Sequence, residues 1–319
     1  MKALWLENQT VTFRDDVPMP EPGPGDALIR MRLAGICSTD LEMARGYYPF
    51  TGVLGHEFVS EVVEAPDPTW VGARVAGEIS IVCGECPHCL AGRSSHCLHR
   101  KTLGIKDYDG VFAEYLRLPL ENLHRVPDSV PDEEAVFTEP LAAALEIHEQ
   151  IHIHPTDRAL VVGAGRLGQL IAQTLALIGC DLRVVARHDY QRQILNDRGI
   201  VTVTEDEIGM GEMDLVVDAT GAPGGFALAR RAVRPRGTLV VKSTYADDLT
   251  VDFSSLVVDE VRVVGSRCGP FAPALRLLEN DQVDPTPLIM GRYPLSEGLA
   301  ALEHAAKPGV FKILLQPDD

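Results

Sequence analysis

The fold is decided by a stretch in the middle of the chain, which reads Ala159-Leu160-Val161-Val162-Gly163-Ala164-Gly165-Arg166-Leu167-Gly168. The apolar run before the glycines predicts a buried strand, and the residues from Gln169 to Leu175 predict a helix. In a strand-turn-helix, this glycine spacing permits a tight turn, the close approach of a pyrophosphate and close helix packing. We therefore predict a dinucleotide site at Gly163, Gly165, Arg166, Leu167 and Gly168; the alternative is a glycine turn without a ligand.

Strand and helix patterns alternate on the C-terminal side of this stretch. The further strand candidates are Leu182 to Ala186, Leu215 to Asp218, Thr238 to Val241 and Val261 to Val264. Such alternation predicts an α/β fold with a parallel, doubly wound sheet. The N-terminal part is instead β-rich, because Ala27 to Leu33 alternates and Phe58 to Val63 is rich in β-branched residues. The sequence therefore predicts two domains, one β-rich and one α/β.

The end of the second strand of the sheet bears on the choice of cofactor. NAD sites usually place an acidic residue there, which accepts hydrogen bonds from the ribose, whereas this chain has Arg187 and His188. A planar guanidinium can pair with a 2′-phosphate, so NADP is predicted in preference to NAD. The alternative is a solvated Arg187 in an NAD enzyme, with Asp189 serving the ribose.

Four cysteines in one loop, Cys83, Cys86, Cys89 and Cys97, are spaced as C-x2-C-x2-C-x7-C. Closely spaced thiolates can form a tetrahedral shell around Zn²⁺ with bonds of about 2.3 Å, so the loop is predicted to fold around a structural zinc. Disulfides or scattered core thiols are the alternative. Nothing else in the sequence indicates an oxidising compartment.

Composition restricts the class of protein. The chain has 319 residues, of which 45% are hydrophobic and 24% charged, and its net charge is -17. No run of about 18 apolar residues could span a membrane, and no signal peptide follows Met1, so we expect a cytoplasmic protein. The acidic charge would repel phosphate backbones and anionic lipids, which argues against nucleic-acid or membrane partners.

A second set of metal ligands can be assembled from Cys37, His56, Glu57 and Glu139. It mixes sulfur, nitrogen and oxygen donors, as an open catalytic zinc site can. Each residue alone is ambiguous, and their joint appearance in this order is what favours a site.

At this point the chain resembles the zinc-dependent medium-chain dehydrogenase/reductase superfamily of alcohol, sorbitol and threonine dehydrogenases. The matching sequence motifs are Gly35-Ile36-Cys37-Ser38-Thr39-Asp40, Gly55-His56-Glu57, the four-cysteine loop, Asp109-Gly110-Val111-Phe112-Ala113-Glu114-Tyr115, Glu139-Pro140-Leu141 and the glycine stretch. The resemblance implies a GroES-like β-barrel catalytic domain over 1–147, a Rossmann domain over 148–283 and a return to the catalytic domain over 284–319. It also implies an active site in the cleft between the domains and a homodimer or homotetramer.

The resemblance further implies a role for each matching residue. Cys37, His56 and one or both of Glu57 and Glu139 would hold the catalytic zinc, which makes two Zn²⁺ per chain with the cysteine loop. A glutamate at position 139, where typical alcohol dehydrogenases have cysteine, indicates the polyol and threonine dehydrogenase branch.

Four more residues receive a role in the same way. Asp40 would hold the His56 ring, unless it is only a turn or cap carboxylate. Thr39 would pass the alcohol proton toward the cofactor ribose. Lys312 would reach the pyrophosphate, unless it is solvated. Glu42 stands where many relatives have a histidine, and it could be a base, a contact to a polar substrate or a solvated carboxylate.

The implied reaction is a zinc-assisted hydride transfer between an alcohol and NADP, the alcohol being a secondary alcohol, a polyol, a sugar or an amino alcohol. The same reaction with NAD is the first alternative. A non-enzymatic, zinc-stabilised binding module is the second, because compact cysteine clusters also build such modules. A zinc-free quinone reductase is disfavoured by the intact Cys37, His56 and Glu57.

Overall fold

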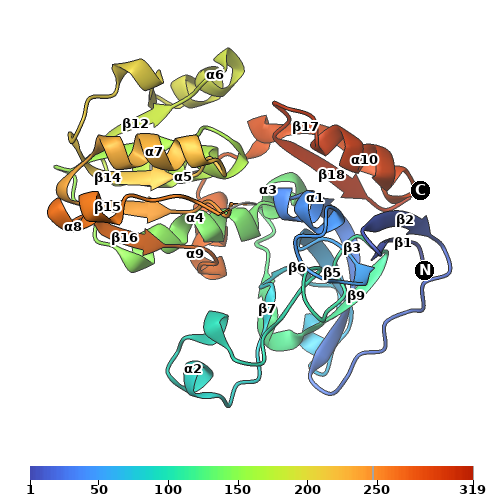
Figure 1. The fold of residues 1–319 in the computed structure, drawn as a ribbon. Coiled ribbons are helices and arrows are strands. Elements are labelled where there is room, and N and C mark those ends of the chain that lie inside the picture. Colours follow the sequence, from blue (N-terminus) through green and yellow to red (C-terminus); the bar gives the residue numbers. More distant parts are fainter. Residues whose placement is uncertain (246–247, 319) are drawn as a thin grey trace. The chain divides into compact units, whose positions relative to one another are not determined.

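The computed structural model describes residues 1–245 and 248–318, which fold into two compact units (Figure 1). Unit 1 comprises Met1–Glu139 and Phe271–Asp319, and unit 2 comprises Pro140–Pro270. The structure contains a β-rich part and an α/β part, the two kinds of part that the sequence predicts. The domain boundaries that the sequence analysis expects, after residues 147 and 283, remain a prediction.

The first segment of unit 1 is rich in strands. In chain order it contains β1 (Ala3–Glu7), β2 (Thr10–Arg14), β3 (Asp26–Gly35), α1 (Ser38–Ala44), β4 (Gly52–Val53), β5 (Glu57–Glu64), β6 (Arg74–Gly77), β7 (Ser80–Ile81), α2 (Pro87–Leu90), β8 (Lys101–Thr102), β9 (Tyr115–Pro119), β10 (Leu123–Arg125) and α3 (Asp132–Ala135). The second segment adds α9 (Phe271–Glu279), β17 (Ile289–Pro294), α10 (Gly298–Ala305) and β18 (Lys312–Gln316).

The main sheet of unit 1 has the order β10-β6-β5-β3-β18-β17, and β9 also pairs with β3. Strand β3 forms because its apolar residues alternate, which buries Ala27, Ile29 and Met31 on one face. Strand β18 pairs antiparallel with β3, with Leu314 opposite Gly35. The end of the chain therefore returns to the end of β3, directly before Cys37.

Unit 2 contains a six-stranded sheet in the order β13-β12-β11-β14-β15-β16, in which every neighbouring pair is parallel. The elements are β11 (Arg158–Val162), α5 (Arg166–Ala176), β12 (Asp181–Val185), α6 (Asp189–Asp197), β13 (Val201–Val203), β14 (Met213–Asp218), α7 (Pro223–Ala232), β15 (Val233–Val241), α8 (Phe253–Val258) and β16 (Arg262–Gly265). Helix α4 (Thr138–Gln150) begins at the boundary of the units. The predicted doubly wound parallel sheet is confirmed.

The core of unit 2 lies between the sheet and its helices. Helix α5 packs on β11 and β12, and α7 packs on β14 and β15. Residues from both layers form one buried cluster that includes Leu160, Val216 and Ala229. This packing holds the carboxyl ends of the strands in register, so that residues just after each strand meet at one edge of the sheet.

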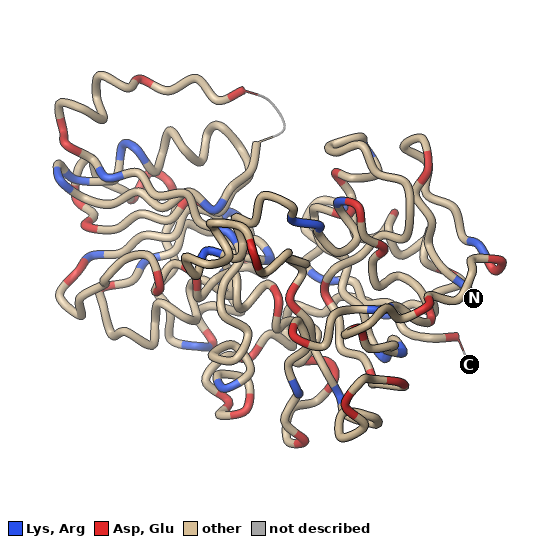
Figure 2. The backbone as a smooth tube through the Cα atoms, turned by 90° about the horizontal axis from the view of Figure 1, so that it is seen from below, with Lys and Arg blue, Asp and Glu red and all other residues tan. Residues whose placement is uncertain are grey.

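Charge is spread over both units. Figure 2 shows basic and acidic residues interspersed along the backbone. The described chain contains no helix that is both long and apolar enough to cross a membrane. A cytoplasmic location remains a prediction.

Candidate functional site

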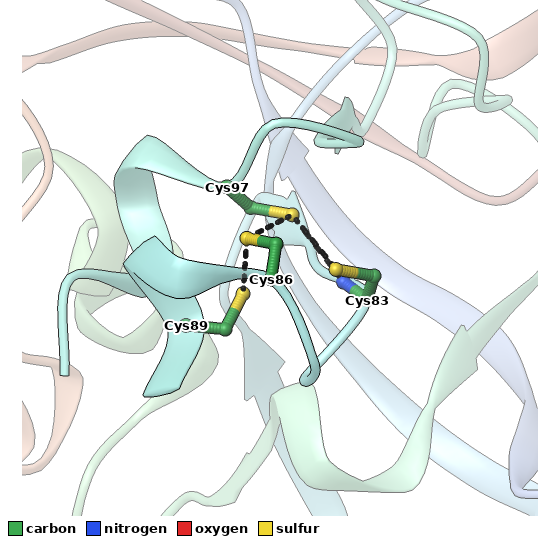
Figure 3. A group of neighbouring side chains, drawn as sticks. All are labelled: Cys83, Cys86, Cys89 and Cys97. Atoms are coloured by element: carbon green, nitrogen blue, oxygen red, sulfur yellow. Dashed lines mark hydrogen bonds between the residues drawn. The ribbon is translucent and has the colours of Figure 1, made fainter. Parts of the chain in front are cut away.

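The four cysteines of the loop in unit 1 converge, as Figure 3 shows. The Sγ atom of Cys86 lies 3.5 Å from that of Cys89 and 3.9 Å from that of Cys97, and the Cys97 and Cys83 sulfurs are 3.5 Å apart. Four ligands at about 2.3 Å from one tetrahedral ion are about 3.8 Å from one another. The sulfur separations therefore fit a zinc ion without rearrangement, and none of the seven cysteines of the described chain is in a disulfide.

The local fold explains why these thiols meet. Cys86 caps α2, which starts with Pro87 and places Cys89 one turn later on the same side. Backbone N–H groups of Leu98 and Cys89 lower the pKa of the Cys86 thiol to about 6, whereas burial and neighbouring thiols raise that of Cys89 to about 12. The thiols therefore differ in how readily they lose a proton, and binding of a zinc ion would require their deprotonation.

A second group in unit 1 consists of Cys37, His56 and Glu57, whose ligand atoms all lie within 4.8 Å of one another. Two zinc bonds can span at most about 4.6 Å, so small adjustments would bring all three donors onto one ion. Cys37 precedes α1, and His56 and Glu57 stand at the start of β5, which pairs with the end of β3. The pairing of β3 with β5 is therefore what brings distant residues together.

Asp40 organises this group from within α1. Its Oδ2 accepts a hydrogen bond from the Cys37 backbone N–H at 2.8 Å, and its Oδ1 lies 3.1 Å from His56 Nδ1 in a close but poorly aligned contact. Both side chains are buried. Burial alone would lower the pKa of His56, but the Asp40 charge and the polar contacts with Asp40 and Cys37 raise it well above its usual value. Asp40 thus engages Nδ1 and leaves Nε2 for a metal.

The buried carboxylate of Glu57 already has a cationic partner. Lys312, at the start of β18, forms an ion pair with Glu57 and also donates to the Ile36 carbonyl at 3.4 Å. Gly35 makes room for the pair, because a Cβ there would lie 2.7 Å from Glu57 Oε2. The lysine predicted to reach the cofactor is therefore placed beside the metal-ligand group, and a cofactor contact by Lys312 stays a prediction.

The remaining predicted residues of unit 1 are less closely grouped. Glu139 lies in the first turn of α4, outside the group of ligand atoms within 4.8 Å. The Cys37 thiol approaches Thr39 Oγ1 at 3.7 Å. Glu42 pairs with Arg45 at 2.6 Å, and both side chains are exposed, so of its open interpretations the solvated carboxylate agrees best with the structure.

A pocket of about 230 Å³ lies in unit 2 at the carboxyl edge of the parallel sheet. It is lined by Gly163, Ala164 and Gly165 after β11, by Arg187 and His188 after β12, and by Ala219 and Thr220 after β14. Register explains the grouping, since Val162 pairs with both Val185 and Asp218. The predicted glycine stretch and Arg187 are therefore brought to one site.

The glycines fit a dinucleotide for separate reasons. Gly163 has a φ of +102°, which favours glycine, and it makes the turn out of β11. A Cβ on Gly168 would lie 1.8 Å from the Gly163 carbonyl oxygen, so only glycine lets α5 pack against the turn. A Cβ on Gly165 would meet nothing within 4 Å, which leaves open space at the N-terminus of α5. Open space there, next to the N-terminal N–H groups of α5, suits a pyrophosphate.

The ribose end of the pocket contains residues that the sequence did and did not identify. Arg187 is exposed and His188 caps α6, where its ring stacks on Tyr190. Asp189, the alternative ribose ligand, is fully exposed and lies outside the pocket lining. Glu205 was missed, although it lines the pocket and pairs with Arg187 at 2.7 Å. Its signal in the sequence is weak, a glutamate shortly after the short strand Val201–Val203.

Known proteins resemble the chain over nearly its whole length. Residues 23–128 match the alcohol dehydrogenase GroES-like domain family. A sorbitol dehydrogenase from Halalkalibacterium halodurans is 30% identical, over 95% of this chain and 94% of that protein. An L-threonine 3-dehydrogenase from a Chelativorans species is 32% identical, over 83% of this chain and 80% of that protein.

Solved structures agree. A zinc-binding dehydrogenase from Sinorhizobium meliloti, bound to NADP, superposes with a TM-score of 0.91 at 29% identity and covers 99% of both chains. The acetophenone reductase from Geotrichum candidum in complex with NAD has a TM-score of 0.89 at 26% identity and covers 99% of this chain and 96% of its own. These similarities agree with the two groups of possible metal ligands and with the pocket beside the glycine stretch. The chain therefore belongs to the zinc-dependent medium-chain dehydrogenase/reductase superfamily and is an NAD(P)-dependent alcohol dehydrogenase of the zinc type.

Proposed function

We propose that the enzyme transfers a hydride between NADP and a secondary alcohol, polyol, sugar or amino alcohol. The observation that carries the cofactor choice is Arg187, which lines the nucleotide pocket where an acidic ribose ligand would otherwise stand. When bound, zinc supplies Lewis-acid stabilisation of negative charge on the alcohol oxygen, and the nicotinamide supplies the hydride acceptor. The sorbitol and threonine dehydrogenases among the relatives support a substrate from this range of alcohols.

The chain's own residues would prepare the alcohol. We propose that Cys37 and His56, with one or both of Glu57 and Glu139, hold a catalytic zinc. The closeness of three of these donors supports the assignment. In the proposal, Asp40 orients the His56 ring, and Thr39 passes the alcohol proton toward the cofactor ribose; the closeness of Asp40 to His56 and of Thr39 to the Cys37 thiol supports these roles.

Lys312 bears on which glutamate would contact the metal. Its ammonium neutralises Glu57 in a buried pair, so the carboxylate is stable there without an ion. A zinc ligand role for Glu57 would require it to share its charge between two cations. Glu139 differs from Glu57, because it lies outside the group of possible metal ligands and its carboxylate would have to move toward that group to bind the ion.

A second zinc in the cysteine loop completes the proposed metal content of two ions per chain. The sulfur separations support a tetrahedral site of four thiolates with no open position. Such a site has a structural role, because no coordination position remains for a substrate.

The preference for NADP can be bounded from the exposure of Arg187. A charge-assisted hydrogen bond to a 2′-phosphate contributes about 1.5 to 3 kcal/mol. The Arg187 side chain is 70% exposed, however, and solvent screening reduces such a contact toward about 1 kcal/mol. We expect NADP to be preferred by roughly fivefold to tenfold. The NADP bound to the Sinorhizobium neighbour supports this choice, and the NAD bound to the Geotrichum enzyme supports the alternative.

We also propose a homodimer or homotetramer. The sheet of unit 2 ends in β16, an edge strand with an exposed Val263. Helix α8 leads toward this strand and exposes Phe253, Val257 and Val258, by 71%, 73% and 81%. An apolar edge of this kind is a favourable surface for pairing with a second copy.

The test is a panel of secondary alcohols, polyols, sugars and amino alcohols assayed with NADP and with NAD at saturating cofactor. Oxidation of at least one alcohol class, with a higher kcat/KM for NADP, is the expected result. Arg187→Asp should reverse the cofactor preference, because it removes the phosphate partner and supplies a ribose acceptor. A higher kcat/KM with NAD in the unmutated enzyme would refute the cofactor choice and favour the alternative, a solvated Arg187 in an NAD enzyme.

A further inference from the structure

We propose that Glu205 is a specificity-determining residue at the ribose end of the nucleotide pocket. Its carboxylate holds the guanidinium of Arg187 and opposes a 2′-phosphate, so it limits the preference for NADP and keeps NAD usable. The proposal deepens the proposed function and rests on it in one respect, that Arg187 faces the adenosine ribose. The sequence did not point to Glu205, because it follows β13 whereas Arg187 follows β12.

The parallel register places the two side chains together. Val185, the last residue of β12, pairs with Val203, the last residue of β13. Arg187 follows the first strand by two residues and Glu205 follows the second by two, so both stand at the same edge of the sheet. Arg187 Nε lies 2.9 Å and Nη2 lies 2.7 Å from Glu205 Oε1.

The turn that carries Glu205 is held by its neighbours. Glu207 Oε2 accepts hydrogen bonds from Thr204 N at 2.7 Å and Thr204 Oγ1 at 2.9 Å. Arg231 Nη2 donates to the Glu205 backbone carbonyl at 3.1 Å. These contacts fix the backbone of the turn while leaving the Glu205 carboxylate directed at Arg187.

The charges of Arg187 and Glu205 determine how strongly the pocket binds a 2′-phosphate. The Arg187 and Glu205 side chains are 70% and 48% exposed, so their ion pair is weak and a phosphate dianion can compete for the guanidinium. The carboxylate nevertheless stays within the same pocket and repels the dianion. A ribose 2′-hydroxyl has no charge to be repelled, and a carboxylate can accept its hydrogen bond. Glu205 therefore affects the two cofactors in opposite directions.

The neighbouring acidic residues of the turn provide a matched control. Asp206 precedes Glu207 in the same turn but does not line the pocket. The pKa of the Asp206 carboxyl is lowered, and the first cause is the neighbouring Thr204 hydroxyl, which itself donates to Glu207 at 2.9 Å. Asp206→Asn removes the same charge as Glu205→Gln from the same turn, so the comparison separates a contact within the pocket from a general change of charge.

The experiment measures binding of 2′,5′-ADP and 5′-AMP to the full-length, zinc-loaded enzyme by calorimetry, without turnover. We expect Glu205→Gln to bind 2′,5′-ADP about fivefold more tightly and to bind 5′-AMP equally or more weakly, since one unit of screened repulsion is lost. Asp206→Asn should change both affinities by less than about twofold.

The outcomes separate this proposal from the proposed cofactor choice. If Glu205→Gln leaves the ratio of the two affinities unchanged or weakens 2′,5′-ADP, Glu205 does not oppose the phosphate and the proposal is overturned. An equal effect of Asp206→Asn overturns it as well, because the cause would then be general charge. Arg187→Gln tests the cofactor choice: if it leaves the unmutated ratio unchanged, NADP preference by Arg187 fails, while the Glu205→Gln ratio still decides the role of Glu205.

Discussion

Replacing Gly168 with alanine should lower the stability of the fold and distort the nucleotide pocket. An added Cβ would lie 1.8 Å from the Gly163 carbonyl oxygen and 3.0 Å from its carbonyl carbon. The obstacle is backbone, so no side-chain rotation can relieve it, and α5 would have to move from the turn by on the order of 1.5 Å. Overpacking costs about 1 to 3 kcal/mol, and a gain of about 1 kcal/mol from replacing a helical glycine offsets part of it.

The expected result is a loss of about 1 to 2 kcal/mol in the free energy of unfolding, together with weaker dinucleotide binding, because a backbone clash this close lies toward the upper end of the overpacking cost. Gly165→Ala is the matched control. Its Cβ would meet nothing within 4 Å, and the backbone φ of -77° is ordinary for alanine. Gly165 caps α5, so stability should fall by less than about 1 kcal/mol. The methyl group would still occupy the space that the pyrophosphate needs.

Urea unfolding of each variant gives the stability, and calorimetric titration with NADP gives the affinity. Gly168→Ala should change both quantities, whereas Gly165→Ala should weaken NADP at least about tenfold with little change in the urea midpoint. The packing argument is refuted if Gly168→Ala is as stable as the parent enzyme. The placement of the pyrophosphate is refuted if Gly165→Ala binds NADP with unchanged affinity.

Three further predictions concern metals and assembly. Metal analysis of the purified enzyme should give two Zn²⁺ per chain, and Cys37→Ala or His56→Ala should abolish turnover and lose one ion while far-ultraviolet circular dichroism stays unchanged; a single ion that survives Cys37→Ala would contradict this. Cys86→Ala, or removal of zinc from the cysteine loop by a chelator, should lower the melting temperature or prevent folding, because structural zinc contributes folding free energy, and an unchanged melting curve would disprove a structural role. Val258→Asp should dissociate the oligomer in sedimentation experiments, whereas Met210→Asp, which alters another exposed apolar side chain, should not; an unchanged mass for Val258→Asp would exclude this edge as the interface.

Several features of the fold were predictable because they depend on neighbours in the chain. The alternation in Ala27 to Leu33 predicted a strand that the structure extends over Asp26–Gly35. The glycine stretch predicted a strand, a turn and a helix, each of which is present. Cys86 and Cys89 are close because one helical turn connects them, which their spacing predicts, whereas Cys83 and Cys97 lie outside that helix.

The sequence by itself determined the α/β class, the order of the two parts, the cysteine loop and the types of residue that could bind metal. Only the tertiary structure decided the long-range partners. The Lys312 and Glu57 pair joins residues 255 positions apart, and it exists because β18 returns beside β3. Glu205 reaches Arg187 only through the register of β12 and β13. Such contacts depend on how strands pair, and strand pairing is settled by packing over the whole sheet and not by the local pattern of residues.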